Sequence, residues 1–486
     1  LGADRTGTCL VYGPADGTAD GVYSSHPDVV ARTLQVDGDW DKVSLAEFIL
    51  TGKVSYPHTY YSRVRALPFG GVHRFDLRGS PAPQLHREAD WPLEFKLDSR
   101  EDPEDLSREL SEALGKATQR RTHPELGDAT IALSGGLDSR AILCSADERA
   151  ELAAFCCFDR ENLEYRTAGA IADQAGVELL PLKRPFDYYG DHAEEGVRIS
   201  GGMGDIGSNH FLGFRDRILG LGTDSLITGC YFDYLFKSLA IDTTTHQLSR
   251  LERLGPFKHE SYLPHFDFGT PITGAVRERI DGLFPADLRR DTSGLARLEI
   301  AKRRTFPLQY EGDNVQRTTV QRTMRWYPPA VDSDIIDVYL RTPVELRLNK
   351  AIFTKMVLDR CSERICRIPD TNTGVRVGAP RSTVAMNRYR IAVRRAFERR
   401  RESIASDESW PNWSYYLRAS SRVRELWSRP NTAATAALGD ILGGEFSARI
   451  SAYLGESGGF RSSALLLRLL TAKIWLDQRT HPPRVG

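Results

Sequence analysis

A short segment rich in serine and glycine is the clearest chemical signal in this sequence. The segment reads SGGLDS and follows directly after the apolar run 129–133. It consists of Ser134, Gly135, Gly136, Leu137, Asp138 and Ser139. Two glycines let the backbone turn tightly and approach an anion, while serine hydroxyls and the start of a helix add hydrogen-bond donors. The segment predicts a phosphate-binding loop, although it lacks the GxxxxGK[ST] pattern of a Walker A loop.

An acidic side chain inside this loop predicts a bound cation. The carboxylate of Asp138 would repel a phosphate group unless a cation lay between them, so its presence indicates Mg²⁺. The alternative interpretation of the segment is an ordinary strand-to-helix turn that binds nothing.

The elements around the loop predict an α/β domain. Short apolar strands are expected at residues 129–133, 152–158, 177–182 and 225–228. Helices are expected to start at Pro103 and at Arg140, and a third to end at Gly176. Strands that are apolar on both faces and alternate with helices are typical of a parallel sheet covered on both sides. We therefore expect a doubly wound parallel sheet within residues 103–380.

Two further regions are expected beside this domain. Residues 1–95 predict a β-rich unit, with strands at 9–12, 22–24 and 71–75 and a helix at 44–50. A stretch rich in proline and charge, from 81 to 103, predicts a domain boundary. Residues 381–486 predict a helical C-terminal extension.

Arginines are concentrated in one part of that extension. Seven of the fourteen residues in 388–401 are arginine, with Tyr389, Ile391, Val393 and Phe397 between them. A surface helix whose arginine stems cover apolar surface is the preferred interpretation. A face that binds nucleic acid or phosphate is the alternative.

Composition excludes several classes of protein. The 486 residues contain 65 basic and 65 acidic side chains, so no global charge attracts nucleic acid or anionic lipid. No apolar run is long enough to span a membrane. Seven cysteines without a CxxC pair predict free thiols in a reducing cytoplasm. Because the sequence starts at Leu1 without a methionine or a secretory signal, we expect its true N-terminus to be missing or processed away.

The SGGLDS loop resembles the pyrophosphatase loop of the N-type ATP pyrophosphatases, and other motifs resemble the asparagine synthetase family in particular. Residues 228–236 resemble the second loop of that family, [ST]GEGxDELFGG, with Asp233 at its Mg²⁺-binding aspartate. Residues 329–348 resemble PFLDxxLVEFxxxLPxELKI, and Lys355 falls near the lysine of EKxxLR. Residues 368–374 are similar to a segment of asparagine synthetase-related proteins from bacterial biosynthetic clusters.

The first residues resemble the glutamine amidotransferase domain of the same family. Residues 2–12 are similar to its RDxxGxKPLYY strand, and residues 23–27 to its FASExK segment. The resemblance implies a partial amidotransferase domain of the Ntn type. The half of that domain with the nucleophilic cysteine is not in this sequence, so no cysteine is assigned that role.

The resemblance also implies a chemistry and a set of site residues. An adenine nucleotide α-hydrolase-like synthetase domain would bind ATP and Mg²⁺, adenylate a carboxylate and form an amide. The implied binding residues are Ser134, Gly135, Gly136, Leu137 and Ser139 for pyrophosphate, Asp138 and Asp233 for the metal, and the backbone near Phe158 and Gly229 for adenosine. Lys355 would stabilise the tetrahedral intermediate as the catalytic lysine. If the alignment is shifted by five residues, Lys350 takes that role.

Several substrates and one inactive form remain open. The default reaction converts aspartate to asparagine, with glutamine or ammonia as the nitrogen donor. Intramolecular amide formation, as in β-lactam synthetases and lasso-peptide cyclases, is the first alternative. The position of the tyrosine that marks β-lactam synthetases is occupied here by Cys230, which counts against that branch. A degenerate nucleotide-binding protein without turnover is the second, because the second loop is altered and residues 234–238 replace ELFGG. Arg140 replaces the family's usual second serine, and as a cation it could contact phosphate. No membrane or nucleic-acid partner is expected.

Overall fold

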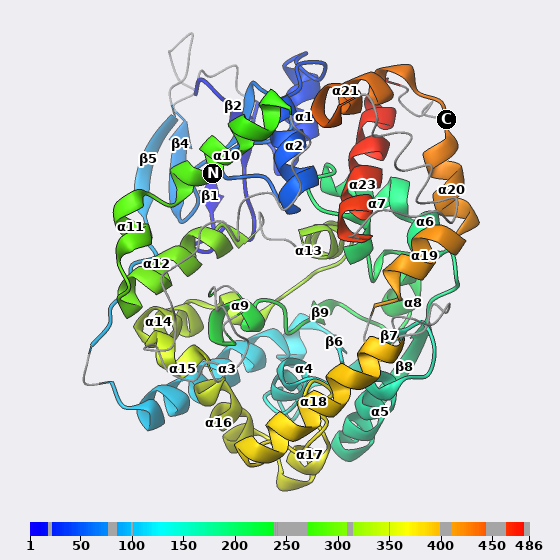
Figure 1. Ribbon diagram of the computed structural model, residues 1–486. Coiled ribbons are helices and arrows are strands. Elements are labelled where there is room, and N and C mark those ends of the chain that lie inside the picture. Colours follow the sequence, from blue (N-terminus) through cyan, green and yellow to red (C-terminus); the bar gives the residue numbers. More distant parts are fainter. Residues whose placement is uncertain are drawn as a thin grey trace.

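The chain folds into two connected parts in the computed structural model (Figure 1). The lower part in that view holds a parallel sheet with its helices, and the upper part combines the first strands and helices with the last helices. The structure describes residues 1–17, 22–75, 85–98, 101–237, 239, 241, 270–308, 314–348, 350–398, 410–443 and 463–480.

Four parallel strands form the sheet, in the order β8-β7-β6-β9. Their bounds are Glu178–Lys183, Leu152–Phe158, Ala129–Ala132 and Ser225–Ile227 respectively. The four predicted strands are thus confirmed, with shifts of one residue at some ends. Short central strands of buried apolar residues explain why the prediction succeeded, since such strands need cover on both faces.

Helices flank the parallel sheet. Helix α3 (Pro103–Arg121) is capped by the Asp102 carboxylate, which accepts a hydrogen bond from the Glu104 N–H, and it buries Leu106, Leu110 and Leu114. Helix α5 (Leu163–Ala175) ends at Gly176, whose φ of +68° is the left-handed conformation that glycine adopts freely. Helix α4 (Leu137–Leu143) begins at Leu137 rather than at Arg140 as predicted, because Gly136 already serves as its N-cap. The mixed α/β character of the prediction is confirmed.

The N-terminal region contains two small antiparallel sheets. One joins β1 (Gly2–Ala3), β4 (Gly71–Phe75) and β5 (Leu85–Asp90), and the other joins β2 (Tyr12–Pro14) and β3 (Val64–Ala66). The strand predicted at 71–75 is confirmed, and the helix predicted at 44–50 lies within α2 (Lys42–Thr51).

Two predicted N-terminal strands are wrong. The strand predicted at 9–12 begins only at Tyr12, because the Asp4 carboxylate accepts hydrogen bonds from the N–H groups of Thr6, Thr8 and Cys9 and holds that segment in a turn. The strand predicted at 22–24 is reduced to a single bridge between Ser24 and Tyr12.

The C-terminal helices return to the N-terminal region. Helix α23 (Ser463–Thr480) packs against α2 and against α7 (Ala193–Ser200). Its Trp475 is completely buried and makes edge-on ring contacts with Tyr60 and Tyr61, at centroid distances of 4.9 and 5.5 Å. Ion pairing between Arg479 and Asp28 reinforces this contact. One apolar core therefore includes residues of all three predicted regions.

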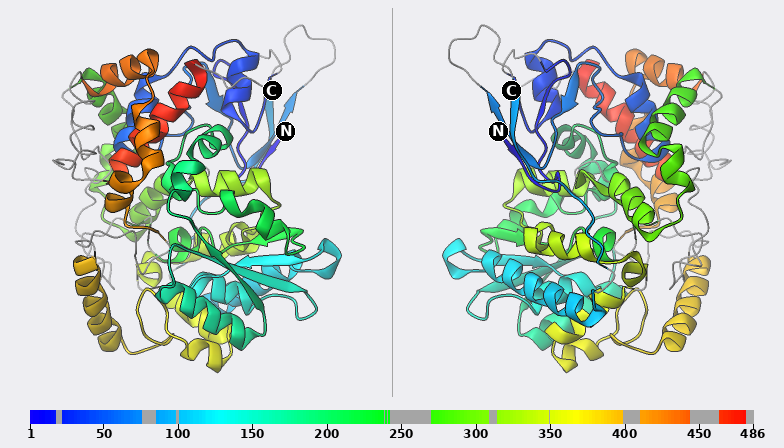
Figure 2. Two further views of the ribbon diagram at one scale, coloured as in Figure 1. Left: turned by 90° about the vertical axis from the view of Figure 1, so that its right-hand side faces the viewer. Right: turned by 90° about the vertical axis from the view of Figure 1, so that its left-hand side faces the viewer.

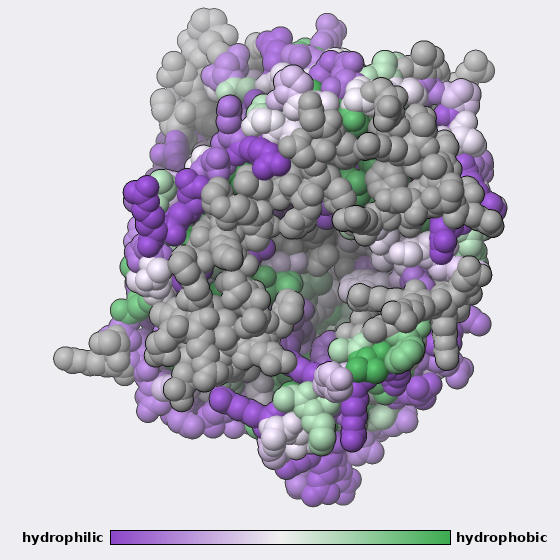
Figure 3. Space-filling view, in the orientation of Figure 1, coloured by the Kyte–Doolittle hydropathy of each residue, from purple (hydrophilic) through white to green (hydrophobic). Residues whose placement is uncertain are grey.

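Helix α18 (Arg381–Glu398) lies on the outside of the molecule (Figure 2). It contains most of the arginine-rich segment, and residues 399–401 of that segment lie outside the described residues. A surface helix is confirmed there. Two of its aromatic side chains are largely exposed, Tyr389 at 72% and Phe397 at 64%. The apolar surface of this helix is visible in Figure 3.

The remaining described α-helices complete the fold. They are α1 (Pro27–Thr33), α6 (Tyr188–Asp191), α8 (Arg215–Leu219), α9 (Phe232–Phe236), α10 (Pro271–Leu283), α11 (Ala286–Arg290), α12 (Gly294–Thr305), α13 (Asn314–Thr323), α14 (Ser333–Arg341), α15 (Val344–Leu348), α16 (Ala351–Arg360), α17 (Glu363–Arg367), α19 (Trp413–Ala419), α20 (Ser421–Ser428) and α21 (Thr432–Leu442). Across the parts of the chain that the structure describes, no helix combines the length and the apolar character needed to cross a membrane.

Candidate functional site

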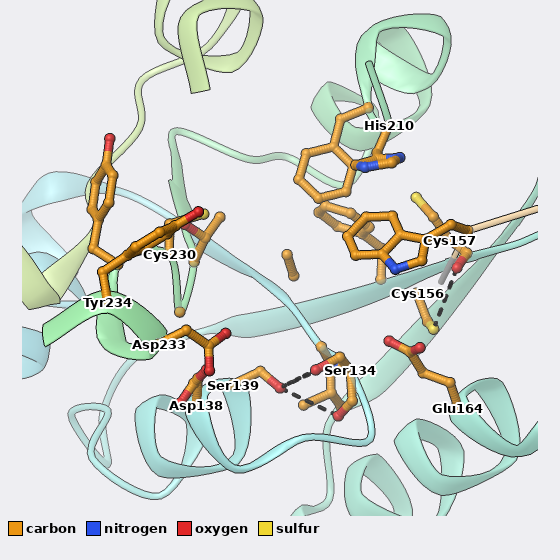
Figure 4. A pocket seen from close by; sticks show the side chains of 18 of the residues that line it. Ser134, Asp138, Ser139, Cys156, Cys157, Glu164, His210, Cys230, Asp233 and Tyr234 are labelled. Atoms are coloured by element: carbon orange, nitrogen blue, oxygen red, sulfur yellow. Dashed lines mark hydrogen bonds between the residues drawn. The ribbon is translucent and has the colours of Figure 1, made fainter. Parts of the chain in front are cut away.

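A cavity of about 250 Å³ lies at the carboxyl ends of the parallel strands. Ligands bind at this edge in open α/β sheets, because the loops that follow the strands converge there. Five residues predicted from the sequence line the cavity: Ser134, Asp138, Ser139, Gly229 and Asp233. Figure 4 shows that Asp138, Ser139 and Asp233 lie close together at one end, with Ser134 beside them.

The SGGLDS loop is a compact turn held by its own serines. The hydroxyl groups of Ser134 and Ser139 are 3.1 Å apart, and the N–H groups of Ser134 and Gly136 donate to the Ser139 and Ser134 hydroxyls respectively. Gly136 is the N-cap of α4, and no side chain caps this end of the helix. The first turn of α4 therefore presents backbone N–H groups toward the same end of the cavity as the serine hydroxyls.

Residues 368–374 pack directly against this loop. A Cβ atom on Gly135 would lie 2.2 Å from the Thr371 methyl group, so only glycine allows the approach. The Thr371 N–H donates to the Gly135 carbonyl at 3.2 Å. Arg140, which is completely buried, donates to the carbonyls of Gly135, Ile365, Ile368 and Pro369. Its guanidinium group thus ties the two segments together and faces carbonyl oxygens.

The second predicted loop packs against the SGGLDS loop at Gly229. A Cβ atom on Gly229 would lie 2.5 Å from the Asp138 Cβ, so this position too requires the absence of a side chain. Tyr231 then adopts a φ of +78°, which is uncommon for a bulky residue, and α9 begins directly after it. This turn places Asp233 and Lys237 on the side of α9 that faces Asp138.

Lys237 joins the two predicted metal ligands. Its Nζ lies 2.5 Å from one carboxylate oxygen of Asp138 and 2.8 Å from one of Asp233. The Lys237 side chain is only 5% exposed, and its Nζ also lies 5.1 Å from the centre of the Phe353 ring. The sequence analysis did not select Lys237. Its spacing of four residues from Asp233 on a helix is a signal that could have found it.

The charged groups of this cluster shift one another's pKa values. Burial raises the pKa of Asp138 to about 7, with the Asp233 carboxylate adding to the rise and Lys237 opposing it. Burial alone would lower the pKa of Lys237, but the carboxylates of Asp138 and Asp233 raise it above its usual value. Lys237 is therefore a permanent cation at neutral pH.

The predicted Mg²⁺ between Asp138 and Asp233 does not fit the residues as they stand. Mg²⁺ requires oxygen ligands at about 2.0–2.1 Å, and an ion in contact with both carboxylates would fall in the space that the Lys237 ammonium already fills. Within the described ranges, no group of three or more His, Cys, Asp or Glu side chains is arranged to hold a metal ion.

The other end of the cavity was missed by the sequence analysis. It is lined by Cys156, Cys157, Glu164, Arg184, His210 and Trp410. Arg184 forms a buried two-bond ion pair with Asp159, at 3.1 and 3.2 Å. Because Asp159 and Arg184 each directly follow a strand, β7 and β8, their position after strand ends was the available signal. Phe158, which was predicted to border adenosine, stacks on Tyr165 and is not among the lining residues.

The two candidate lysines lie in different surroundings. Lys355 pairs with Glu104 at 3.0 Å on the surface, and its side chain is 38% exposed. Lys350 precedes α16 with a φ of +55° and is half-buried. Burial and the nearby Lys237 lower the pKa of Lys350, while Asp233, Asp370 and Asp138 oppose that shift. Lys350 is therefore within electrostatic reach of Asp138 and Asp233, whereas Lys355 lies on the face of α16 that meets α3.

His210 provides a pH-dependent contribution to stability. Burial, and then the charge of Arg184, hold its pKa well below 6.5 in the folded chain, where Tyr189 bonds to its Nδ1 at 3.0 Å. The unfolded chain binds a proton near pH 6.5, so the stabilisation is complete above that pH and is lost as the pH falls below it. As the pH falls from about 7.5 to about 5.5, we expect the free energy of unfolding to decrease less in His210→Gln than in the wild type. Urea unfolding at both pH values measures this difference. The matched variant His123→Gln, at a side chain that is 41% exposed, is expected to follow the wild type. An equal loss in His210→Gln would contradict the prediction.

Neither a scan against models of protein families nor a search of curated proteins found a match to this chain.

Proposed function

We propose that this chain is an ATP-dependent, AMP-forming ligase of the asparagine synthetase type. The observation that carries the proposal is the meeting of two loops at one cavity: SGGLDS after β6, and residues 228–236 after β9. Both glycines that these loops need for close approach, Gly135 and Gly229, lie where a side chain would collide. Two turns without a shared function would not need glycines at these positions after the neighbouring strands β6 and β9.

The proposed fold is finer than the mixed α/β arrangement described above. It is a doubly wound, adenine nucleotide α-hydrolase-like synthetase domain, preceded by part of an Ntn-type amidotransferase domain and followed by a helical extension. The strand order β8-β7-β6-β9, with the phosphate loop on a central strand, supports this proposal.

The proposed reaction has two steps. A carboxylate oxygen of the substrate attacks the α-phosphorus of ATP, pyrophosphate leaves, and an acyl-adenylate forms. An amine then attacks the acyl carbon, and AMP leaves as the amide bond forms. Ser134, Ser139 and the backbone N–H groups of α4 would hold the leaving pyrophosphate. Lys350 would stabilise the negative oxygen of the second step.

ATP would bring the Mg²⁺ that the reaction needs, bound to its own phosphates. Aspartate is the default carboxylate and glutamine or ammonia the default nitrogen donor, with intramolecular amide formation as the alternative. A cytoplasmic location, where ATP is available, fits this reaction.

The products of ATP cleavage test the proposal. With a competent carboxylate, AMP and pyrophosphate should appear in equal amounts, because the bond that breaks is the one between the α- and β-phosphates. The measurement is a screen of carboxylates, aspartate first, for pyrophosphate release coupled to chromatography of the nucleotides. Formation of ADP and orthophosphate instead would contradict the proposed reaction.

A second candidate function is nucleotide binding without turnover. The ammonium of Lys237 between Asp138 and Asp233 favours it, because it removes the protein-held ion that the resemblance implies. Binding of ATP with no AMP formed for any carboxylate and amine would support this candidate.

A further inference from the structure

We propose that Lys237 is a built-in cation of this site, which takes the place of a divalent metal ion held by the protein. Its ammonium group would remain between Asp138 and Asp233 while the phosphates of a nucleotide are bound beside it. The part of this inference that concerns nucleotides rests on the proposed function, whereas the exclusion of a metal ion from the two carboxylates does not.

Three contacts fix the Lys237 side chain in this position. Its Nζ contacts Asp138 at 2.5 Å and Asp233 at 2.8 Å. The face of the Phe353 ring lies on another side, 5.1 Å from Nζ, and a ring face attracts a cation. Phe353 is itself completely buried, and Lys237 is almost completely so. A lysine with these three partners is held in place and does not sample the solvent.

The ammonium and a divalent ion exclude each other. Both would need to touch the same two carboxylates, and the gap between these has room for one of them. The wild-type chain is therefore expected to bind free divalent ions poorly at this position.

A fixed ammonium group can replace a metal ion in one respect, because it neutralises negative charge beside a bound phosphate group. It cancels one of the charges of Asp138 and Asp233, which line the cavity, so this end of the cavity repels a phosphate group less. Position 237 is also where the second-loop pattern of the resemblance carries a glycine, which could supply no charge. The replacement of that glycine by lysine is thus a gain of a cation at the carboxylates.

Binding of Mn²⁺ without any nucleotide tests the exclusion directly. Mn²⁺ is followed by electron paramagnetic resonance in the wild type and in Lys237→Met. We expect Lys237→Met to bind one Mn²⁺ about tenfold or more tightly than the wild type, because the variant removes the ammonium group that lies between the two carboxylates. The double variant Lys237→Met/Asp233→Asn should lose this gain.

Lys302→Met is the matched control. Lys302 also pairs with one carboxylate, that of Glu299 at 2.8 Å, and lies 5.7 Å from the centre of the Phe95 ring, but Glu299, unlike Asp138 and Asp233, is not among the residues that line the cavity. Its variant should bind Mn²⁺ as the wild type does. Circular dichroism confirms that each variant is folded before Mn²⁺ is added.

Two results would overturn the inference. One is a wild-type chain that binds one Mn²⁺ tightly and loses it in Asp233→Asn; this result needs only these two proteins, so it decides the question even if Lys237→Met does not fold. The other is a folded Lys237→Met that gains no affinity for Mn²⁺.

Binding of ATP in the presence of a chelator separates this inference from the proposed function. We expect wild-type affinity for ATP to change by less than about threefold between excess Mg²⁺ and excess EDTA, since the lysine replaces the protein-held ion. A wild type that binds ATP only with Mg²⁺ would contradict the role of Lys237 toward nucleotides. A wild type that binds ATP under neither condition would instead contradict the proposed function, and the Mn²⁺ experiment would still decide the exclusion.

Discussion

Replacement of Lys350 by methionine is expected to lower amide-forming turnover about a hundredfold or more while the affinity for ATP changes little. Lys350 directly precedes α16 with a φ of +55°, and its charge interacts with those of Asp233 and Asp138. A cation aimed at the negative oxygen of the tetrahedral intermediate stabilises the transition state more than the bound substrate. Steady-state turnover and equilibrium binding of ATP, measured on the same preparation, separate the two effects.

Lys355→Met distinguishes the two lysines. Lys355 is a surface residue paired with Glu104 and Asp359, so its loss should leave turnover close to that of the wild type. A strong loss in Lys355→Met together with a mild effect of Lys350→Met would favour the register that the sequence motif predicts. If both variants keep wild-type turnover, neither lysine serves the amide-forming step.

Replacement of Trp475 by alanine is expected to lower the free energy of unfolding by about 3–5 kcal/mol. The indole is completely buried between Tyr60, Tyr61 and Trp40, with ring centroids at 4.9, 5.5 and 6.0 Å, and the Arg479 guanidinium lies 4.4 Å from its centroid. Its removal leaves a cavity where α23 meets the N-terminal region. The midpoint of urea unfolding, followed by circular dichroism, measures the loss.

Trp91→Ala is the control for that experiment. Trp91 is 47% exposed, so the same change of residue type should alter the free energy of unfolding by about 0.5 kcal/mol or less. A Trp475→Ala midpoint close to the wild-type midpoint would mean that α23 contributes little to the fold. The contact between the two ends of the chain would then not be part of the stable core.

The parallel strands could be predicted from the sequence because their signals are local. Residues 152–158 form a strand with the bounds that their apolar run indicates, and Gly176 ends α5 where its left-handed conformation is needed. The SGGLDS turn is local in the same way, since its own serines hold it together. Propensity, periodicity and capping act over a few residues, so one stretch of sequence contains all the information.

The charge at the site was decided only by the tertiary structure. Asp138 and Lys237 are 99 residues apart, and nothing local to either indicates that they touch. Their contact depends on the parallel register of β6 and β9, which brings Gly229 against Asp138, and on the turn at Tyr231 that orients α9. The sequence motif likewise favours Lys355 over Lys350, and only the packing of α16 on α3 and α4 shows how differently the two lysines are surrounded. A side chain acts through the atoms around it, and for these residues the fold brings those atoms from distant parts of the chain.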